Sequence, residues 1–381
     1  METNTELKMI HLSEVESQQI KWLWYPFIPY GKLSIVQGDP GDGKSTLILN
    51  IAAKLSRGEC IDENMNITEP VNVIYQTAED GLADTVKPRL EAAKISEELG
   101  IKRHQTEAAV KLIDEGNTIP FISRYRKEAT GELNDEQLRK LYERLVYLRN
   151  LEEKKEQVIS SIEEQGKLTE ELKKQILAAE TLVAVEDLYR PYRPKRRTRA
   201  TIAKEKGLEP LAALITLQKT KEPLEKTAEA YISEEKGVES AKDAISGACD
   251  IIAESISDEA AYRTWIRETT MRKGKVTSQA KNPEAESVYE MYYEFEEPIK
   301  KLAGHRILAL NRGEKEKFLT VKVNAPEEEI LRYLEHQVIT KENPVTSPVL
   351  KEVVDDCYKR LIAPAIEREI RSNLTDQAED G

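Results

Sequence analysis

The segment from Gly38 to Ser45 has the residue types and spacing of a phosphate-binding loop. It reads G-D-P-G-D-G-K-S, which fits the pattern G-x-x-x-x-G-K-[S/T] at every fixed position. Glycines let backbone N–H groups curl around phosphate oxygens, the lysine supplies positive charge, and the serine hydroxyl can bind Mg²⁺. A chance glycine-rich turn is the alternative. The motif predicts a weak site for ATP and Mg²⁺, with Ser45 as the metal ligand, at Gly38, Gly41, Gly43, Lys44, Ser45 and Thr46.

A second chemical signal lies between Tyr189 and Arg199, where six cations occur without one acidic residue. Two prolines keep this stretch extended, so its side chains should splay outward. Guanidinium groups pair with phosphates, and tyrosines can stack on bases. The alternative is a solvated loop whose cations pair with acidic neighbours. The predicted nucleic-acid-binding residues are Arg190, Tyr192, Arg193, Lys195, Arg196, Arg197 and Arg199. For a smaller cluster, Arg124–Lys127, we favour a structural role.

The elements that must position these groups change in character near Lys94. Before it, Leu33–Val36 and Val71–Tyr75 are strand candidates, and helical spacing follows the phosphate loop from Lys44 to Leu55. After it, the pattern predicts a succession of helices.

Caps and apolar stripes mark these later helices. Asn134 with Gln137 predicts an N-cap, and Thr169 predicts the next one. An apolar stripe follows Asn134 at helical spacing, through Leu138, Leu141, Leu145, Leu148, Val158 and Ile162. Two β-like runs, Ile307–Leu310 and Phe318–Val323, flank turn residues and predict a hairpin.

Residues before Lys94 resemble the RecA-like P-loop ATPases of the RepA type. The resemblance rests on Trp22–Trp24, Ile28–Leu33, the phosphate loop and Gln76–Gly81. It implies that Glu79 is the catalytic carboxylate that polarises the attacking water. A Walker-B strand ending in a metal-holding Asp should follow, and we find none in the sequence. Since a RecA-like core needs several more covered parallel strands, we expect a partial segment that binds ATP without turnover.

From Ile95 onward the sequence resembles the Tex transcription accessory proteins. The resemblance implies a role in transcription and nucleic-acid binding. Members of that family continue with an RNase-H-like domain, a helix-hairpin-helix region and an OB-fold RNA-binding module, and the printed sequence ends before all three. Leu99-Gly100-Ile101 is similar to a helix-turn-helix, although ordinary three-helix packing also produces this pattern. The longest matching strings are Ile95–Ile101, Ala109–Gly116, Ile119–Glu128, Glu186–Tyr189, Pro191–Thr201, Ser287–Tyr293, His305–Gly313 and Arg360–Pro364.

Composition narrows the function classes. The 57 basic and 69 acidic residues give a net charge of −12, which argues against a wholly basic nucleic-acid coat but permits a local patch. No apolar run approaches the roughly 20 residues that a membrane span needs. Cys60, Cys249 and Cys357 are too far apart for a metal pair or a disulfide framework. We therefore expect a cytoplasmic protein without a membrane partner.

These observations predict a mainly α fold: a multi-helical Tex-type region with one small β-hairpin near residues 307–323, preceded by an incomplete α/β P-loop segment. The expected domains are 1–93, 94–200 with a helix-turn-helix-like start, and 201–381. The expected function is a non-catalytic transcription accessory scaffold that binds RNA or DNA weakly and contacts the transcription machinery. An ATP-binding RecA-like ATPase and a helical protein-interaction scaffold are the alternatives. Gene rearrangement, deliberate fusion and an assembly error would each leave a truncated P-loop segment joined near residue 94.

Overall fold

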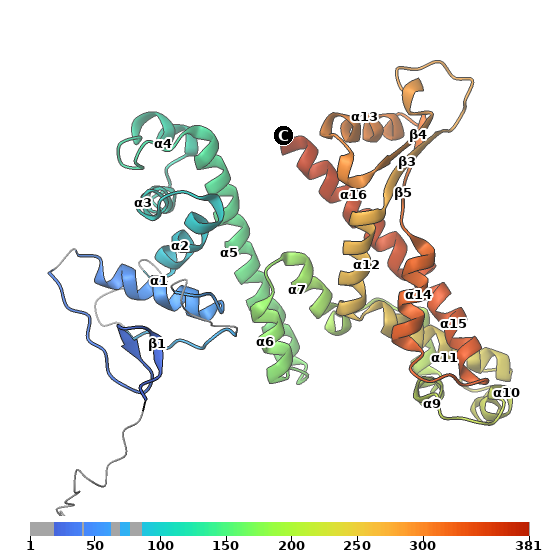
Figure 1. Ribbon diagram of the computed structural model, residues 1–381. Helices are drawn as coiled ribbons and strands as arrows, with labels where there is room; N and C mark the ends of the chain where they lie inside the picture. The colour runs from blue at the N-terminus through green and yellow to red at the C-terminus, as the bar shows by residue number, and fades with distance from the viewer. Residues whose placement is uncertain (1–18, 40–41, 62–68, 77–85, 381) are drawn as a thin grey trace, which may run out of the picture. The chain divides into compact units, whose positions relative to one another are not determined.

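The computed structural model describes residues 19–39, 42–61, 69–76 and 86–380. Within them the chain is mainly helical, with two small antiparallel sheets (Figure 1). Every helix in these ranges is too short or too polar to cross a membrane. The chain divides into two compact units, Met1–Glu152 and Glu153–Gly381. The sequence-based boundaries near residues 93 and 200 stay predictions.

The first unit is a group of helices with one small antiparallel strand pair near its start. The bounds of its elements are β1 Trp22–Trp24, β2 Ile28–Pro29, α1 Lys44–Ser56, α2 Lys87–Leu99, α3 Arg103–Asp114, α4 Ile119–Tyr125 and α5 Asp135–Glu164, of which α5 continues into the second unit.

The start of α5 confirms the predicted cap. The Gln137 backbone N–H donates to Asn134 Oδ1 at 2.8 Å, and the Asn134 N–H donates to Gln137 Oε1 at 3.1 Å. The predicted leucine stripe of α5 is buried, and Ala92 and Ile95 of α2 join the same core. The cap therefore sets where α5 begins, and the leucine stripe sets which of its faces is buried. Thr169 likewise caps α6 (Glu170–Ala178) by accepting from the Leu172 N–H.

Both strand candidates beside the phosphate loop are wrong. Residues 33–36 and 71–75 belong to neither sheet of the described chain, and the side chains of Leu33 and Ile74 are 89% and 97% exposed. A parallel strand needs neighbours for its backbone groups and cover for both faces, and the described residues before α2 supply neither to these two runs. Helix α1 does form after the loop, and it packs against α2. The α/β part of the predicted fold is therefore reduced to α1 and the β1–β2 pair.

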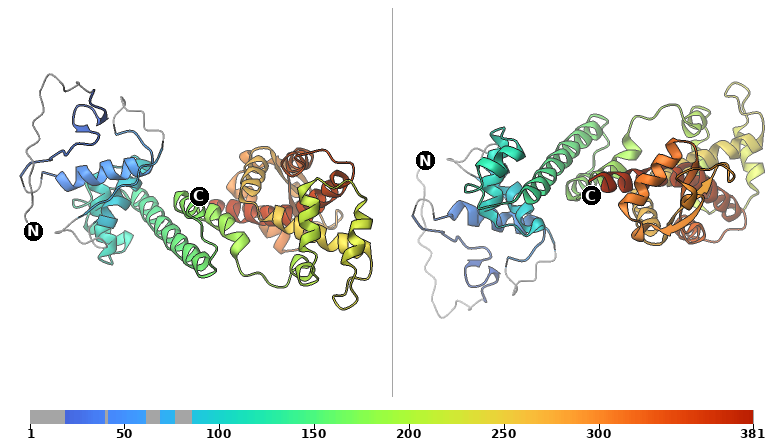
Figure 2. Two further views of the ribbon diagram at one scale, coloured as in Figure 1. Left: turned by 90° about the horizontal axis from the view of Figure 1, so that it is seen from below. Right: turned by 90° about the horizontal axis from the view of Figure 1, so that it is seen from above.

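The second unit holds most of the helices and the three-stranded sheet. Helix α11 lies at its centre and packs against α8, α9, α10 and α15. In both views of Figure 2, the yellow-green helices α8 to α11 lie together at one end of this unit. The bounds are α7 Leu182–Tyr189, α8 Arg199–Glu205, α9 Glu209–Leu217, α10 Leu224–Ala228, α11 Ala241–Ser257, α12 Ala260–Lys273, β3 Lys275–Ala280, β4 Glu294–Pro298, α13 Gly304–Lys315, β5 Leu319–Asn324, α14 Glu327–Val338, α15 Thr346–Asp356 and α16 Ala363–Asp380.

The predicted hairpin near residues 307–323 is wrong in its first half. Ile307–Leu310 lies within α13, whereas the second run does form the strand β5. The partner of β5 is β3, with Val321 opposite Ser278, and β4 pairs with the other edge of β3. Strands β3 and β4 were not predicted.

The apparent turn at residues 311–313 is the last part of a helix. Gly313 lies where α13 meets β5, and a Cβ there would come within 2.5 Å of Leu319 Cδ1. This glycine therefore serves close packing and does not reverse the chain.

Helices α15 and α16 are joined by a π-helical segment, Cys357–Ile362. A π turn accommodates one residue more than an α turn. Apolar side chains are buried on both sides of it, Leu350 and Val354 in α15 and Ile366 and Ile370 in α16. The wider turn therefore lies inside the core of this unit.

Candidate nucleic-acid interface

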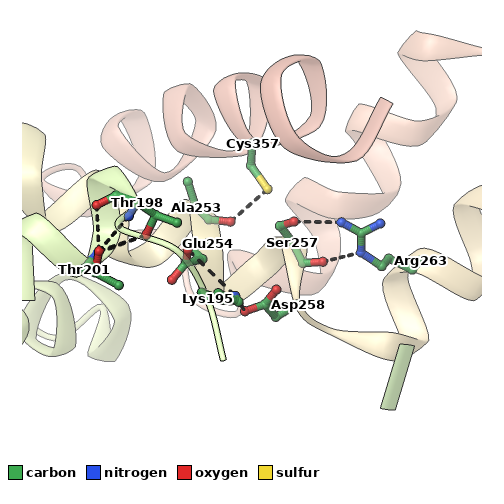
Figure 3. Close-up of polar contacts among 9 residues, drawn as sticks. All are labelled: Lys195, Thr198, Thr201, Ala253, Glu254, Ser257, Asp258, Arg263 and Cys357. Carbon is green, nitrogen blue, oxygen red and sulfur yellow. Dashed lines mark hydrogen bonds and ion pairs between the residues drawn. The ribbon is translucent and has the colours of Figure 1, made fainter. Parts of the chain in front are cut away.

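The basic segment, residues 190–199, connects α7 to α8 in the second unit. It begins with a 3₁₀ turn, Arg190–Tyr192, and ends where Thr198 caps α8. Thr198 Oγ1 accepts a hydrogen bond from the Thr201 N–H at 3.1 Å (Figure 3). The segment is therefore held at both ends by helices.

Lys195 anchors the middle of the basic segment. Its ammonium group pairs with the carboxylate of Asp258 and lies 3.8 Å from Glu254, both near the end of α11 (Figure 3). The Lys195 side chain is only 23% exposed. Burial raises the pKa of Asp258, and the nearby Lys195 opposes that increase. Lys195 therefore holds the segment on the protein and is poorly placed to meet a ligand.

Two further cations form loose surface pairs. Arg193 Nη2 lies 2.9 Å from Glu186, and Arg197 Nη2 lies 3.3 Å from Glu205. The Arg197 side chain is 71% exposed. Exposed pairs of this kind contribute about 0–1 kcal/mol, so a phosphate group can replace the carboxylate at little cost.

The remaining predicted residues differ in exposure. Arg196 and Arg199 are exposed, and their side chains form no hydrogen bond or ion pair within the described chain. Arg190 is half-buried, and its Nε has no hydrogen-bond partner there. Tyr192 is half-buried as well, and its carbonyl accepts from Gln165 Nε2 at 2.9 Å. The outward cations are therefore Arg193, Arg196, Arg197 and Arg199.

A buried polar cluster lies at the end of α11, the helix on which Lys195 is anchored. Arg263 is 1% exposed, and its guanidinium donates to Ser257 O at 2.5 Å and to Ser257 Oγ at 2.9 Å (Figure 3). Burial lowers the pKa of Arg263 to about 10. The Cys357 thiol donates to Ala253 O at 3.1 Å. These contacts join α11 to α12 and to the π-helical segment.

The predicted nucleotide-binding residues lie around the start of α1. Gly43 adopts a left-handed φ of 78° before the helix, and Lys44, Ser45 and Thr46 form its first turn. Lys44 Nζ donates to Gly38 O at 2.8 Å and to Asp39 O at 2.5 Å. The lysine ammonium is thus turned onto carbonyl oxygens of its own loop.

The other residues of this prediction lie outside the described chain. These are Gly41 and the predicted catalytic Glu79. Within the described ranges, no group of three or more His, Cys, Asp or Glu side chains could hold a metal ion.

Comparisons with known proteins place the helical part of the chain in a class. Residues 91–163 match the Tex-like protein N-terminal domain, and residues 218–381 match the Tex central region-like domain. Residues 164–217 lie between the two matched ranges.

Individual relatives agree with these two matches. The uncharacterized protein YdcI of Bacillus subtilis is 48% identical over 290 residues, which cover 75% of this chain and 40% of YdcI. The transcriptional accessory protein Tex of Neisseria gonorrhoeae is 39% identical over 293 residues, 75% of this chain and 38% of that protein. The human S1 RNA-binding domain-containing protein 1 is 32% identical over 301 residues, 75% of this chain and 30% of that protein. The chain therefore spans well under half the length of each of these relatives.

Proposed function

We propose that this Tex-like chain acts as a non-catalytic transcription accessory scaffold that contacts RNA or DNA through the basic segment. One observation carries the proposal. Four arginines, Arg193, Arg196, Arg197 and Arg199, are exposed in a segment that Lys195 holds on α11. Two relatives support it, because their names include transcriptional accessory protein and S1 RNA-binding domain.

The contact should be weak and indifferent to sequence. Arginines that meet phosphates release counterions, so about four contacts to a single strand imply a log–log salt slope near −3. The net charge of −12 repels a polyanion, which favours dissociation constants of about 10⁻⁴ to 10⁻⁶ M.

The test compares two variants with equal loss of charge. Arg196→Gln/Arg197→Gln should flatten the salt slope by about 1.4, since each single-strand phosphate contact contributes about 0.7. The control, Arg139→Gln/Lys140→Gln, removes two cations of α5 that are 66% and 60% exposed, and it should bind like the wild type. Fluorescence anisotropy of a labelled 12-nucleotide strand between 50 and 200 mM salt measures both. Equal binding by all three proteins would refute a role for the basic segment, and no binding at 50 mM would favour a protein-interaction scaffold.

For residues 1–93 we propose a RecA-like origin and weak binding of ATP with Mg²⁺. The support is the intact loop sequence and the helix α1 that follows it. We also retain the domain division at residues 94 and 200 and a cytoplasmic location as proposals.

A further inference from the structure

Helix α4 of the first unit carries two aromatic rings on its outer face. The rings of Phe121 and Tyr125 lie 5.3 Å apart, centroid to centroid, and their residues are 38% and 70% exposed. Aromatic residues are usually buried because of their large apolar area, so an exposed pair one helical turn apart is unusual. The Arg126 guanidinium lies 5.8 Å from the Phe121 ring centroid. We call Phe121, Arg124, Tyr125, Arg126 and Lys127 the α4 surface.

The cations of the α4 surface, like Arg196 and Arg199 of the basic segment, form no ion pair within the described residues. No carboxylate of the described chain lies within ion-pair distance of Arg124, Arg126 or Lys127. Glu128 and Glu132 are close in sequence but form no ion pair with them. In the basic segment, by contrast, the side chains of Arg193, Lys195 and Arg197 already pair with carboxylates. The cations of the α4 surface are therefore also available to a phosphate group.

The backbone under the α4 surface is held in place. Ile122 is 0% exposed and fixes α4 in the core of its unit. In the turn that follows, Gly131 and Glu132 both adopt left-handed φ angles, 62° and 66°. Gln105 Nε2 of α3 donates to Gly131 O at 2.5 Å and ties this turn to the rest of the unit. Because the backbone that carries the rings and cations is already fixed, binding a ligand does not have to order it, and less conformational entropy is lost on binding.

We infer that the α4 surface binds the unpaired bases of single-stranded RNA or DNA, with Phe121 and Tyr125 stacking on bases and the neighbouring cations meeting phosphates. The inference rests on the proposed function, because it assumes that the chain contacts nucleic acid. Stacking on exposed rings combined with arginine–phosphate contact is how single strands are bound without sequence preference. A duplex keeps its bases stacked inside, so it offers these rings no surface.

Two variants separate stacking from charge. Phe121→Leu/Tyr125→Leu should weaken binding of labelled U12 and dT12 roughly 5- to 50-fold at every salt concentration, with an unchanged salt slope. Arg124→Gln/Arg126→Gln should instead flatten the slope by about 1.4. A 12-base-pair duplex should bind no better to the wild type than to the aromatic variant. If U12 and dT12 differ for the wild type, their ratio identifies the preferred strand.

Controls separate this inference from the proposed function. Tyr142→Leu removes another exposed tyrosine, 43% exposed on α5, and should bind like the wild type. Circular dichroism melting of each variant tests whether it keeps its fold. If only the Arg196/Arg197 variant loses binding, the α4 surface is refuted and the basic segment stands. If only the α4 variants lose binding, the basic segment is refuted. If the folded wild type binds neither strand, both proposals fail.

Discussion

Lys195 shows how a residue of the predicted binding run can serve the fold instead. Its ammonium group satisfies Asp258, a carboxylate whose side chain is 15% exposed. A buried carboxylate without its cation is costly, because neither water nor protein compensates the charge.

Lys195→Gln should therefore lower the free energy of unfolding by about 1–3 kcal/mol at pH 7. The cost should shrink as the pH falls. Burial already raises the folded-state pKa of Asp258, and loss of Lys195 raises it further. A carboxyl group whose pKa is higher in the folded state binds its proton more tightly there, so acid relieves the penalty. Urea unfolding at pH 7 and pH 5 measures the difference between variant and wild type.

The control for this prediction is Lys195→Gln/Asp258→Asn, which removes both charges. It should be more stable than the single variant and should show no such pH dependence. A single variant whose cost is equal at both pH values would contradict the role assigned to Asp258.

The phosphate loop gives a second prediction at the scale of residues. We expect ATP binding to be weak, because the Lys44 ammonium must leave Gly38 O and Asp39 O before it can meet a phosphate. Lys44→Ala should abolish the binding, because it removes the positive charge of the loop. Phosphate release should not exceed that of the Lys44→Ala protein, since a missing metal-holding Asp removes a major part of the chemistry. Equilibrium dialysis and a phosphate-release assay measure the two quantities. Turnover clearly above the variant would restore the ATPase alternative.

At the scale of elements, local signals were predictable and non-local ones were not. Asn134 and Gln137 bond to each other across three residues, and the leucines of α5 recur at helical spacing, so both signals could be read from the local sequence. Strand β4 reads E-F-E-E-P and has little strand character of its own. It forms because β3 pairs with it, and pairing between distant segments leaves no local pattern.

The candidate site was also predictable only in its local features. The run of cations between residues 190 and 199 could be read from the sequence. The Lys195–Asp258 pair could not, because it joins residues 63 positions apart, whereas Glu186 and Glu205 lie on the two flanking helices, seven and eight residues from their arginines. The exposure of Phe121 and Tyr125 was missed for the same reason, although their spacing of four residues was a visible signal.

Gly313 provides the prediction at this scale. Alanine usually stabilises a helix by about 1 kcal/mol relative to glycine. Here its Cβ would come within 2.5 Å of Leu319 Cδ1, and Leu319 is 0% exposed in the core. Overpacking of this kind costs about 1–3 kcal/mol, so Gly313→Ala should leave the protein equally or less stable.

A second glycine-to-alanine change serves as a comparison, at an exposed glycine whose Cβ would have no close neighbours. A Cβ at Gly116 or Gly166 meets nothing within 4 Å, but both residues have positive φ, so alanine there measures backbone strain without packing. Thermal melting that shows Gly313→Ala clearly stabilised would contradict the close packing of α13 on β5.

At the scale of the molecule, helix α2 contains the residue where the match to the Tex-like N-terminal domain begins, residue 91. Ala92 is 0% exposed, and Glu91 pairs with Arg149 at 2.7 Å. Helix α2, Lys87–Leu99, therefore runs through the predicted boundary near residue 94 and buries Ala92, Ala93 and Ile95 on either side of it. Helix α1 adds contacts to α2, including the Arg57–Glu97 pair at 2.7 Å.

We predict that residues 87–381 fold without the preceding segment, whereas residues 95–381 are less stable. Removal of residues 87–94 takes away the first turns of α2, the burial of Ala92 and the partner of Arg149. The melting temperature of the shorter protein should be lower by about 5 °C or more. Circular dichroism melting of both fragments provides the comparison. An unfolded 87–381 fragment would show that the first 86 residues are needed for folding.

The π-helical segment at Cys357–Ile362 has a consequence for how this chain tolerates insertions and deletions. Deleting one residue from an ordinary α-helix rotates everything after it by about 100° and would turn a buried face toward solvent. The wide turn already contains one residue more than an α turn, so losing one there returns the helix to regular winding. Ile366, Ile370 and Leu374 would then keep facing the core. Among homologous sequences aligned over the helix from Thr346 to Asp380, single-residue gaps should therefore concentrate at this one turn.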